Sequence, residues 1–457
     1  MGQLTESITE FLAARWEQPL PAAAVATVVR GFTDCVAVML AGHAEPLPTA
    51  LRQHARRRAA AEPDAPLMLT AERASVADAA RIGTAAAHAL DYDDYAFSNH
   101  VSALLVPAIL ADAARLGAGG AAALEAYLAG FETWGEVFKR EPDHLHSQGW
   151  HPTGVFGPLG VAAALCRLRG FDRERCRNAL GLAVAAGCGL MDNFGSQAKP
   201  WQGARAAGAG VVAVELAELG VDAGPDALDG SGGLLAALSP RGRVDRQRPA
   251  TALGREWLAA RNSLNIKPYP MVGASQRAID AALQLHRDHQ PDPTEIREIV
   301  VRVSEKHAAV MRLHRPQTAA EARFSAEFAV AAALIAGRVS LAELRDDFVR
   351  RDDVQALIAK VRIETTADDD PAYPVGARFD SVQLSLQDGS RLESRPVHRF
   401  RGHGENPLTT EELRAKFLDC SAPAIGRSAA DRLFLDLQRL PDLGSVADLP
   451  ALEFTRG

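Results

Sequence analysis

The first 263 residues are dominated by a helical pattern of apolar and polar positions. Apolar residues recur at spacings of three and four, the period of one face of an α-helix. Ser75 and Asp78 form a capping-box-like start for one of these runs. The pattern predicts helices over residues 23–40, 75–90, 101–116, 121–137, 155–168, 173–186, 201–219 and, further on, 273–286.

The period of the pattern changes near Pro291. Apolar and polar residues then alternate, as they do in half-buried strands, and an Asp388-Gly389 turn leads into a return strand. We expect strands near 299–304, 361–365 and 382–392, with helices between them at 321–335 and 341–348. Helical patterns return from residue 409 and over 428–440.

This order of elements predicts a mainly α protein with two domains. A large all-helical domain comprises residues 1–268 together with 405–457, and an inserted smaller α+β domain comprises residues 269–404. No internal repeat or low-complexity linker is present.

Composition narrows the function classes. The chain has 457 residues, 47% of them hydrophobic and 23% charged, and a net charge of -7, so we expect a globular protein without a nucleic-acid-binding surface. We find no continuous apolar run of about 18 residues and no basic, apolar leader, and therefore predict neither a membrane span nor secretion. Five scattered cysteines without C-x-x-C spacing are typical of the reduced cytoplasm.

Lysine is scarce, and its positions are informative. Only six of the 50 basic residues are lysines. In such a chain, a lysine is more expected at positions that need a compact ammonium with an adjustable pKa. Three segments, His151-Pro152, Lys199-Pro200 and Lys267-Pro268, each place a cationic side chain before a proline and near a helix start. A helix N-terminus with an added cation suits an anion. The alternative is that the prolines only mark helix entry and the cations face solvent.

Carboxylates gather where the helix over 75–90 ends. Asp91 follows apolar residues and is expected to point inward, where a buried acid beside His or Lys suits proton transfer. Asp93 and Asp94 are expected in a solvated acidic loop. His144 and His146 lack acidic or cysteine partners at ligand spacing, so we predict no metal site.

The ordered motifs of the chain resemble the MmgE/PrpD family, which includes 2-methylcitrate dehydratase, cis-aconitate decarboxylase and iminodisuccinate epimerase. The matching segments are 87–94, 100–103, 149–154, 198–200, 266–270 and 322–325. The resemblance implies a helical domain with an inserted α+β lid, a homodimer, small di- or tricarboxylate substrates, and chemistry that requires no metal or organic cofactor.

The resemblance also implies which positions are functional. The functional positions of the decarboxylase branch correspond in this sequence to Asp91, His100, His151, Lys199 and Lys267. Three departures set this chain apart from that branch, in addition to a loop before His100 that is one residue shorter. They are Tyr95 in place of threonine, Val272 in place of histidine, and Phe328 in place of tyrosine.

From these residues we expect a cofactor-independent, dehydratase-like lyase that removes a proton next to a carboxylate. Asp91, His151 and Lys199 are the expected catalytic residues, with His151 the first choice for general acid/base. The expected substrate-binding residues are Tyr95, His100, Lys267, Arg323 and Ser325. The alternatives, in order, are an epimerase of a dicarboxylate such as iminodisuccinate, a cis-aconitate-type decarboxylase, and a non-catalytic carboxylate-binding protein.

Overall fold

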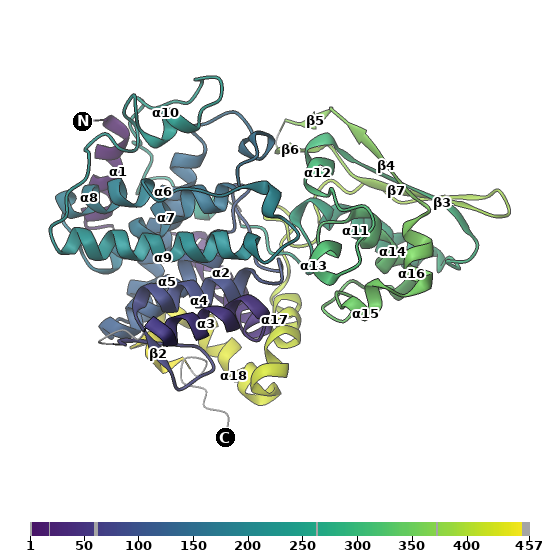
Figure 1. The fold of residues 1–457 in the computed structure, drawn as a ribbon, viewed down its shortest axis with the longest axis horizontal. Coiled ribbons are helices and arrows are strands. Elements are labelled where there is room, and N and C mark those ends of the chain that lie inside the picture. Colours follow the sequence, from purple (N-terminus) through teal and green to yellow (C-terminus); the bar gives the residue numbers. More distant parts are fainter. Residues whose placement is uncertain (1, 18, 59–62, 262–263, 372, 450–457) are drawn as a thin grey trace.

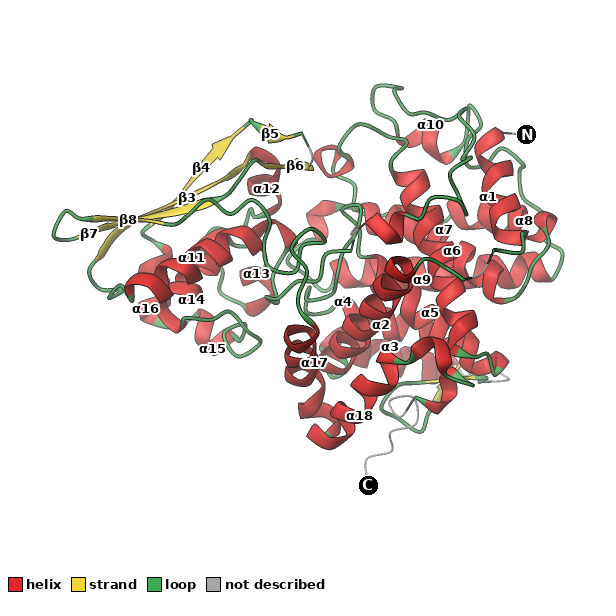
Figure 2. Ribbon diagram, turned by 180° about the vertical axis from the view of Figure 1, so that it is seen from behind, coloured by secondary structure: helices red, strands yellow, loops and turns green. Residues whose placement is uncertain are grey.

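The computed structural model describes residues 2–17, 19–58, 63–261, 264–371 and 373–449. It is mainly α, as the periodicity predicts (Figures 1 and 2). The N-terminal helices are α1 (Gln3–Ala13), α2 (Ala22–Gly42), α3 (Pro46–Arg58), α4 (Val76–His88), α5 (Val101–Leu116), α6 (Gly120–Phe138), α7 (Pro152–Leu168), α8 (Arg173–Val184), α9 (Ala198–Glu218) and α10 (Leu234–Leu238). The sequence did not predict α1, α3, α10 or the short pair β1 (Ala65–Pro66) and β2 (Arg73–Ala74).

The remaining elements belong to two groups. The central region holds α11 (Gln276–His289), β3 (Ile296–Ser304), α12 (Glu305–Val310), α13 (Ala319–Ala322), α14 (Ala326–Ala336), α15 (Asp346–Val349), α16 (Asp352–Ile358), β4 (Val361–Thr366), β5 (Asp369–Asp370), β6 (Tyr373–Ala377), β7 (Ser381–Leu386) and β8 (Arg391–Glu393). The chain ends with α17 (Thr410–Ile425) and α18 (Arg427–Gln438).

Buried apolar residues form two clusters. The first draws on residues between Leu4 and Ile266 and again between Leu408 and Leu449. The second runs from Met191 and Phe194 through residues 271–384. Helices α17 and α18 contact α2, so the chain returns to the first cluster after forming the second (Figure 1).

The second cluster is built around a four-stranded sheet of order β4-β3-β7-β8. β3 pairs in parallel with β4 and antiparallel with β7, and β7 pairs antiparallel with β8. Ile299, Val301 and Val303 alternate onto the buried face, as a period of two requires. Helices α11 and α14 contact this sheet and share the buried core with it.

Two predicted helices differ from the structure. The helix expected over 321–335 is broken into α13 and α14, because Ser325 adopts an extended conformation and its hydroxyl caps α14 by accepting the N–H of Phe328. The helix expected over 341–348 is reduced to α15. There the Glu343 carboxylate accepts both the N–H and the hydroxyl of Ser340, which holds the segment in turns.

Helix α2 corrects one expectation about membranes. By length and hydropathy alone it could cross a bilayer, although the sequence was expected to contain no such segment. In the structure 72% of its most apolar 18-residue window is buried inside the protein. Its apolar side chains therefore pack against other helices of the fold.

Candidate active site

A cavity of about 660 Å³ contains most of the predicted site residues. One part of its wall comes from the helical region and another from the α+β region, through Val272, Gly273 and α12. It is lined by Tyr95, Ser98, His100, His144, His146, His151, Phe194, Lys199, Lys267, Val272, Gly273, Ala274, Lys306, His307 and Val310. No carboxylate is among these lining residues, so the cavity presents cations and imidazoles to a ligand.

Asp91 lies behind the inner wall of the cavity and contacts two of the lysines that line it. The Lys199 ammonium is 2.5 Å from Asp91 Oδ1, and the Lys267 ammonium is 3.4 Å from the same oxygen. Lys267 also donates to the backbone carbonyl of Asp91 at 2.6 Å. Asp91 has φ +51°, a strained conformation for a non-glycine residue. The surrounding contacts hold this conformation and aim the carboxylate at both ammonium groups.

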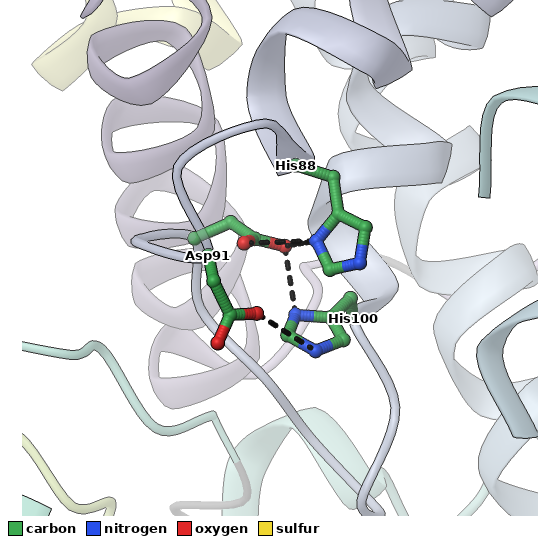
Figure 3. Close-up of side chains that lie close together, drawn as sticks. His88, Asp91 and His100 are labelled. Carbon is green, nitrogen blue, oxygen red and sulfur yellow. Dashed lines mark hydrogen bonds and ion pairs between the residues drawn. The ribbon is translucent and has the colours of Figure 1, made fainter. Parts of the chain in front are cut away.

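Asp93 organises two histidines, His88 and His100, which Figure 3 shows close to Asp91. His88 Nδ1 lies 3.1 Å from Asp93 Oδ1, and His100 Nδ1 lies 2.8 Å from Asp93 Oδ2. If each Nδ1 carries the proton it donates to Asp93, each Nε2 is left as an acceptor. The Nε2 atoms of His88 and His100 lie 3.2 and 3.5 Å from the Lys199 ammonium. Asp93 thus turns two imidazole lone pairs toward one lysine.

The burial of Asp93 and Asp94 contradicts the expectation of a solvated acidic loop, since both are fully buried. Histidines satisfy Asp93, and the N–H of Asp94 donates to Asp34 Oδ2 at 3.0 Å. Lys416, from distant α17, reaches the same place: its ammonium lies 2.5 Å from Asp34 Oδ1 and donates to the Tyr92 carbonyl at 2.9 Å. A contact made by the end of the chain therefore helps to anchor the loop.

We expect Lys416→Met to lower the free energy of unfolding by about 3–5 kcal/mol, because it leaves the Asp34 carboxylate buried without its cation. Urea denaturation measures the change. Lys139→Met is the control, since the Lys139 side chain at the end of α6 is 43% exposed and its partner Glu136 keeps a second ion pair with Arg140. Adding Asp34→Asn to Lys416→Met should recover part of the lost free energy of unfolding. If the double variant instead loses as much stability as the two single variants together, the two residues are not paired.

His151 is the group in the cavity that is best placed to exchange a proton. It occupies the N-cap position of α7 without a side-chain capping hydrogen bond, is almost fully buried, and lines the cavity. Neither ring nitrogen has a hydrogen-bond partner in the described part of the chain. The nearest aromatic neighbour is Phe194, whose ring centroid is 5.0 Å away at nearly a right angle. A buried polar group without partners commonly marks a place for a ligand or for catalysis.

The electrostatics of the cluster favour an ionised Asp91 and neutral histidines. Burial would raise the pKa of Asp91, but Lys199 and Lys267 outweigh it and lower that pKa below its ordinary value. Burial lowers the pKa of Lys199, with Asp91 opposing the shift. Burial also lowers the pKa of His100 to about 3 and that of His151 well below 6.5, with Lys199 contributing to both shifts. Both imidazoles are therefore neutral near pH 7.

His88, Asp91, Asp93 and His100 could also be considered as metal ligands, because one donor atom from each lies within 4.8 Å of the others. The Lys199 ammonium, however, contacts Asp91 and both histidines of this group. A metal ion bound there would have to displace a buried lysine that already compensates the carboxylate. The donor set therefore fits a lysine-centred hydrogen-bond network better than a metal site.

The outer part of the cavity has a second set of basic groups. His144 and His146 stack with ring centroids 5.1 Å apart, and Lys306 and His307 come from α12. Burial lowers the pKa of His146 to about 3 and that of His144 to about 4. Lys306 pairs with Asp369 at 2.5 Å. Basic groups thus lie both at the inner wall and toward the α+β region.

Six of the eight predicted site residues lie together: Asp91, Tyr95, His100, His151, Lys199 and Lys267. Of these six, Asp91 contacts the lining lysines without lining the cavity itself, and the other two predicted residues lie elsewhere. Arg323 lines a neighbouring cavity, and Ser325 serves as the cap of α14 and contacts Glu327 Oε2. Of the family departures, Tyr95 and Val272 line the cavity, whereas Phe328 is buried in the second apolar cluster.

Sequence reasoning missed His88 and Asp93 as members of the site. The available signal was the run from His88 to Asp93 at the end of a helix. It places an imidazole within five residues of two carboxylates, which are groups that can pair with each other. The scarcity of lysine proved a useful signal, since Lys199, Lys267 and Lys416 are all buried around this cluster and Lys306 lines the cavity.

Comparison with known proteins agrees with these motifs. The model of the MmgE/PrpD N-terminal domain matches residues 6–247, and the model of the C-terminal domain matches residues 269–439. Cis-aconitate decarboxylase of Mus musculus is 28% identical over 393 residues, which cover 82% of this chain and 78% of that protein. The Homo sapiens enzyme is 28% identical over 391 residues, with the same coverage. A cis-aconitate decarboxylase-like protein of Aspergillus oryzae is 29% identical over 390 residues, or 80% of this chain and 79% of its own. With both family domains matched over most of its length, the chain belongs to the MmgE/PrpD family.

Proposed function

We propose that this protein is a cofactor-independent lyase that acts on a small di- or tricarboxylic acid by proton transfer at the carbon next to a carboxylate. The observation that carries the proposal is the position of His151. A neutral imidazole with no protein partner lines the same cavity as two buried lysines, and this combination provides a base and a place for negative charge.

In this mechanism Lys199, Lys267 and His100 hold a substrate carboxylate and stabilise the enediolate charge that develops when the neighbouring C–H bond breaks. Helix ends add to this field. His100 and His151 stand at the N-cap positions of α5 and α7, and Lys199 lies in the first turn of α9, so three helix N-termini meet near the cavity. Their partial positive charges favour an anion.

His151 removes the proton. Its pKa is low in the free protein because of burial and the nearby Lys199 charge. A bound carboxylate compensates that charge, so binding raises the basicity of His151 when the substrate is in place. In elimination, the electron pair of the broken C–H bond then forms the double bond as hydroxide leaves with a proton from a nearby acid, for which Lys199 is placed.

A second candidate reaction is decarboxylation of a cis-aconitate-type substrate, since relatives of this chain carry that name. Loss of CO₂ also leaves a carbanion next to an unsaturated acid, and the same lysines can stabilise it before it takes up a proton. Tyr95 and Val272, the cavity residues that depart from the decarboxylase pattern, leave elimination as our first choice.

Proton NMR in D₂O with a panel of acids tests the proposal. The panel contains citrate, 2-methylcitrate, cis-aconitate, malate, tartrate and iminodisuccinate. We expect new vinylic signals from elimination. Loss of a carboxylate would establish decarboxylation instead, and deuterium uptake without any elimination or decarboxylation product would indicate an epimerase. Failure of the folded protein to turn over any acid, despite stabilisation by one of them, would favour a carboxylate-binding protein.

The pH profile provides a separate check on Lys199. Burial lowers its pKa below 10.5, so the ammonium is lost as pH rises through that lowered value. We expect kcat/KM to fall on the basic side below pH 10.5, and Lys199→Arg to move that fall to higher pH, because guanidinium stays charged. Because both proteins are measured with the same substrate, the ionisation of the substrate affects both pH profiles equally. An identical basic limb in both would contradict the assignment.

The homodimer and the role of residues 269–404 as a lid remain predictions from the resemblance, and the cytoplasmic location remains a prediction from the cysteine pattern. Light scattering after size-exclusion chromatography would measure the oligomeric state, with twice the 48.7 kDa chain mass as the expected result.

A further inference from the structure

A second cavity, of about 620 Å³, adjoins the candidate active site and shares Lys199 with it. Its walls come from the start of α3, the end of α4, the start of α9 and α13. It is lined by Glu45, Pro46, Leu47, His88, Ala89, Asp91, Gly195, Ser196, Gln197, Lys199, Pro200, Ala320, Arg323 and Phe324. Three members of the active-site cluster thus also border a separate space.

Arg323 is the unusual residue of this cavity, because it is a buried cation without a counter-ion. Only 8% of the residue is exposed, and within the described part of the chain it forms no ion pair within 4 Å. Its one side-chain hydrogen bond is a long one, from Nη1 to the Ala89 carbonyl at 3.5 Å. Nε is covered and without a partner. A guanidinium in this situation carries a large desolvation cost.

The nearby carboxylates do not remove this cost. Asp91 Oδ1 is already engaged by Lys199 and Lys267, and Asp91 Oδ2 is covered from solvent. Glu45 lines the cavity but is partly exposed and does not pair with Arg323. The cavity therefore has two cations on its wall, Lys199 and Arg323, of which the second lacks compensation at contact distance.

We propose that this second cavity is an anion site that binds a carboxylate on the guanidinium of Arg323. The planar guanidinium fork matches the two oxygens of a carboxylate or bicarbonate and supplies the hydrogen bonds that the protein leaves unmade. The site is distinct from the cavity that holds His151, and it does not depend on which reaction the protein catalyses. An occupant lies near Lys199 and acts on turnover through that shared residue.

Thermal unfolding tests the site without reference to activity. We compare the unaltered protein with Arg323→Met and Arg323→Lys, at constant ionic strength, in chloride, acetate or bicarbonate. In chloride, Arg323→Met should unfold at the same temperature or higher, since it removes an uncompensated buried charge. Acetate or bicarbonate should raise the unfolding temperature of the unaltered protein more than that of Arg323→Met, with Arg323→Lys between them. The larger of the two shifts identifies the preferred anion. Arg345→Met, which alters an exposed pair with Asp347, is the matched control.

Crystals soaked in 4-bromobenzoate, a carboxylate whose aryl bromide does not alkylate side chains, locate the anion directly through the anomalous signal of bromine. We expect bromine beside Arg323 in the unaltered protein and its absence there in Arg323→Met, while any bromine in the His151 cavity remains in both. Equal anion-dependent shifts in both proteins, or bromine only in the His151 cavity, would overturn the proposal. So would strong destabilisation or misfolding of both Arg323 variants in chloride, because Arg323 would then serve the fold and not a ligand.

Discussion

Replacing His151 with glutamine is expected to lower kcat by about 10²–10⁴-fold, the usual contribution of a positioned general base. The ring nitrogens of His151 have no protein partner in the described structure, so the change breaks no internal hydrogen bond of the side chain. Lys199, Lys267 and His100 remain to hold the substrate. The loss should therefore appear mainly in kcat, with a much smaller change in KM.

Steady-state kinetics on the acid identified by NMR would measure this effect. The control is His289→Gln, because His289 is exposed at the end of α11 and does not line the cavity. Thermal unfolding of both variants confirms that the fold is kept. Full activity in His151→Gln would show that another residue, such as Asp91, takes the proton. A purely binding protein would instead lose affinity for the acid and have no turnover to lose.

Replacing Lys199 with methionine is expected to lower kcat/KM by at least about 10²-fold, comparable to the loss of one preorganised group that stabilises an oxyanion. Lys199 contacts Asp91 and faces the Nε2 atoms of His88 and His100. The variant loses the charge that would stabilise the enediolate and the proton donor for the leaving group. Lys267 still compensates Asp91, so we expect the folded state to persist.

Lys139→Met is the matched control for this change, since it removes a lysine from the partly exposed surface of α6. Its kcat/KM should match that of the unaltered protein. Titration calorimetry with an unreactive tricarboxylate separates binding from catalysis. If Lys199→Met weakens binding and kcat/KM by the same factor, Lys199 provides uniform binding and no selective stabilisation of the transition state.

The sequence by itself determined the mainly α fold class and pointed to residues that line one cavity. Helical and strand periods are local properties, because a helix or strand must turn its apolar side chains to one side whatever its neighbours are. The eight long helical patterns therefore correspond to helices, and the change of period near Pro291 marks the start of the strand region. The segments in which His151, Lys199 and Lys267 precede a proline could also be recognised from the sequence. Each combines a cationic residue type with a proline near the start of a helix, and both are local features of the chain.

Only the tertiary structure decided which polar residues are buried and what they contact. Asp93 and Asp94 look like a solvated loop in sequence, yet His88, His100 and Asp34 enclose them, and Lys416 closes the cluster from more than 300 positions away. Arg323 and Ser325 belong to one short motif, but one faces a second cavity and the other caps a helix. The energy of a buried charge depends on the partners within a few ångströms of it. Those partners are set by packing between distant segments, and no local pattern encodes them.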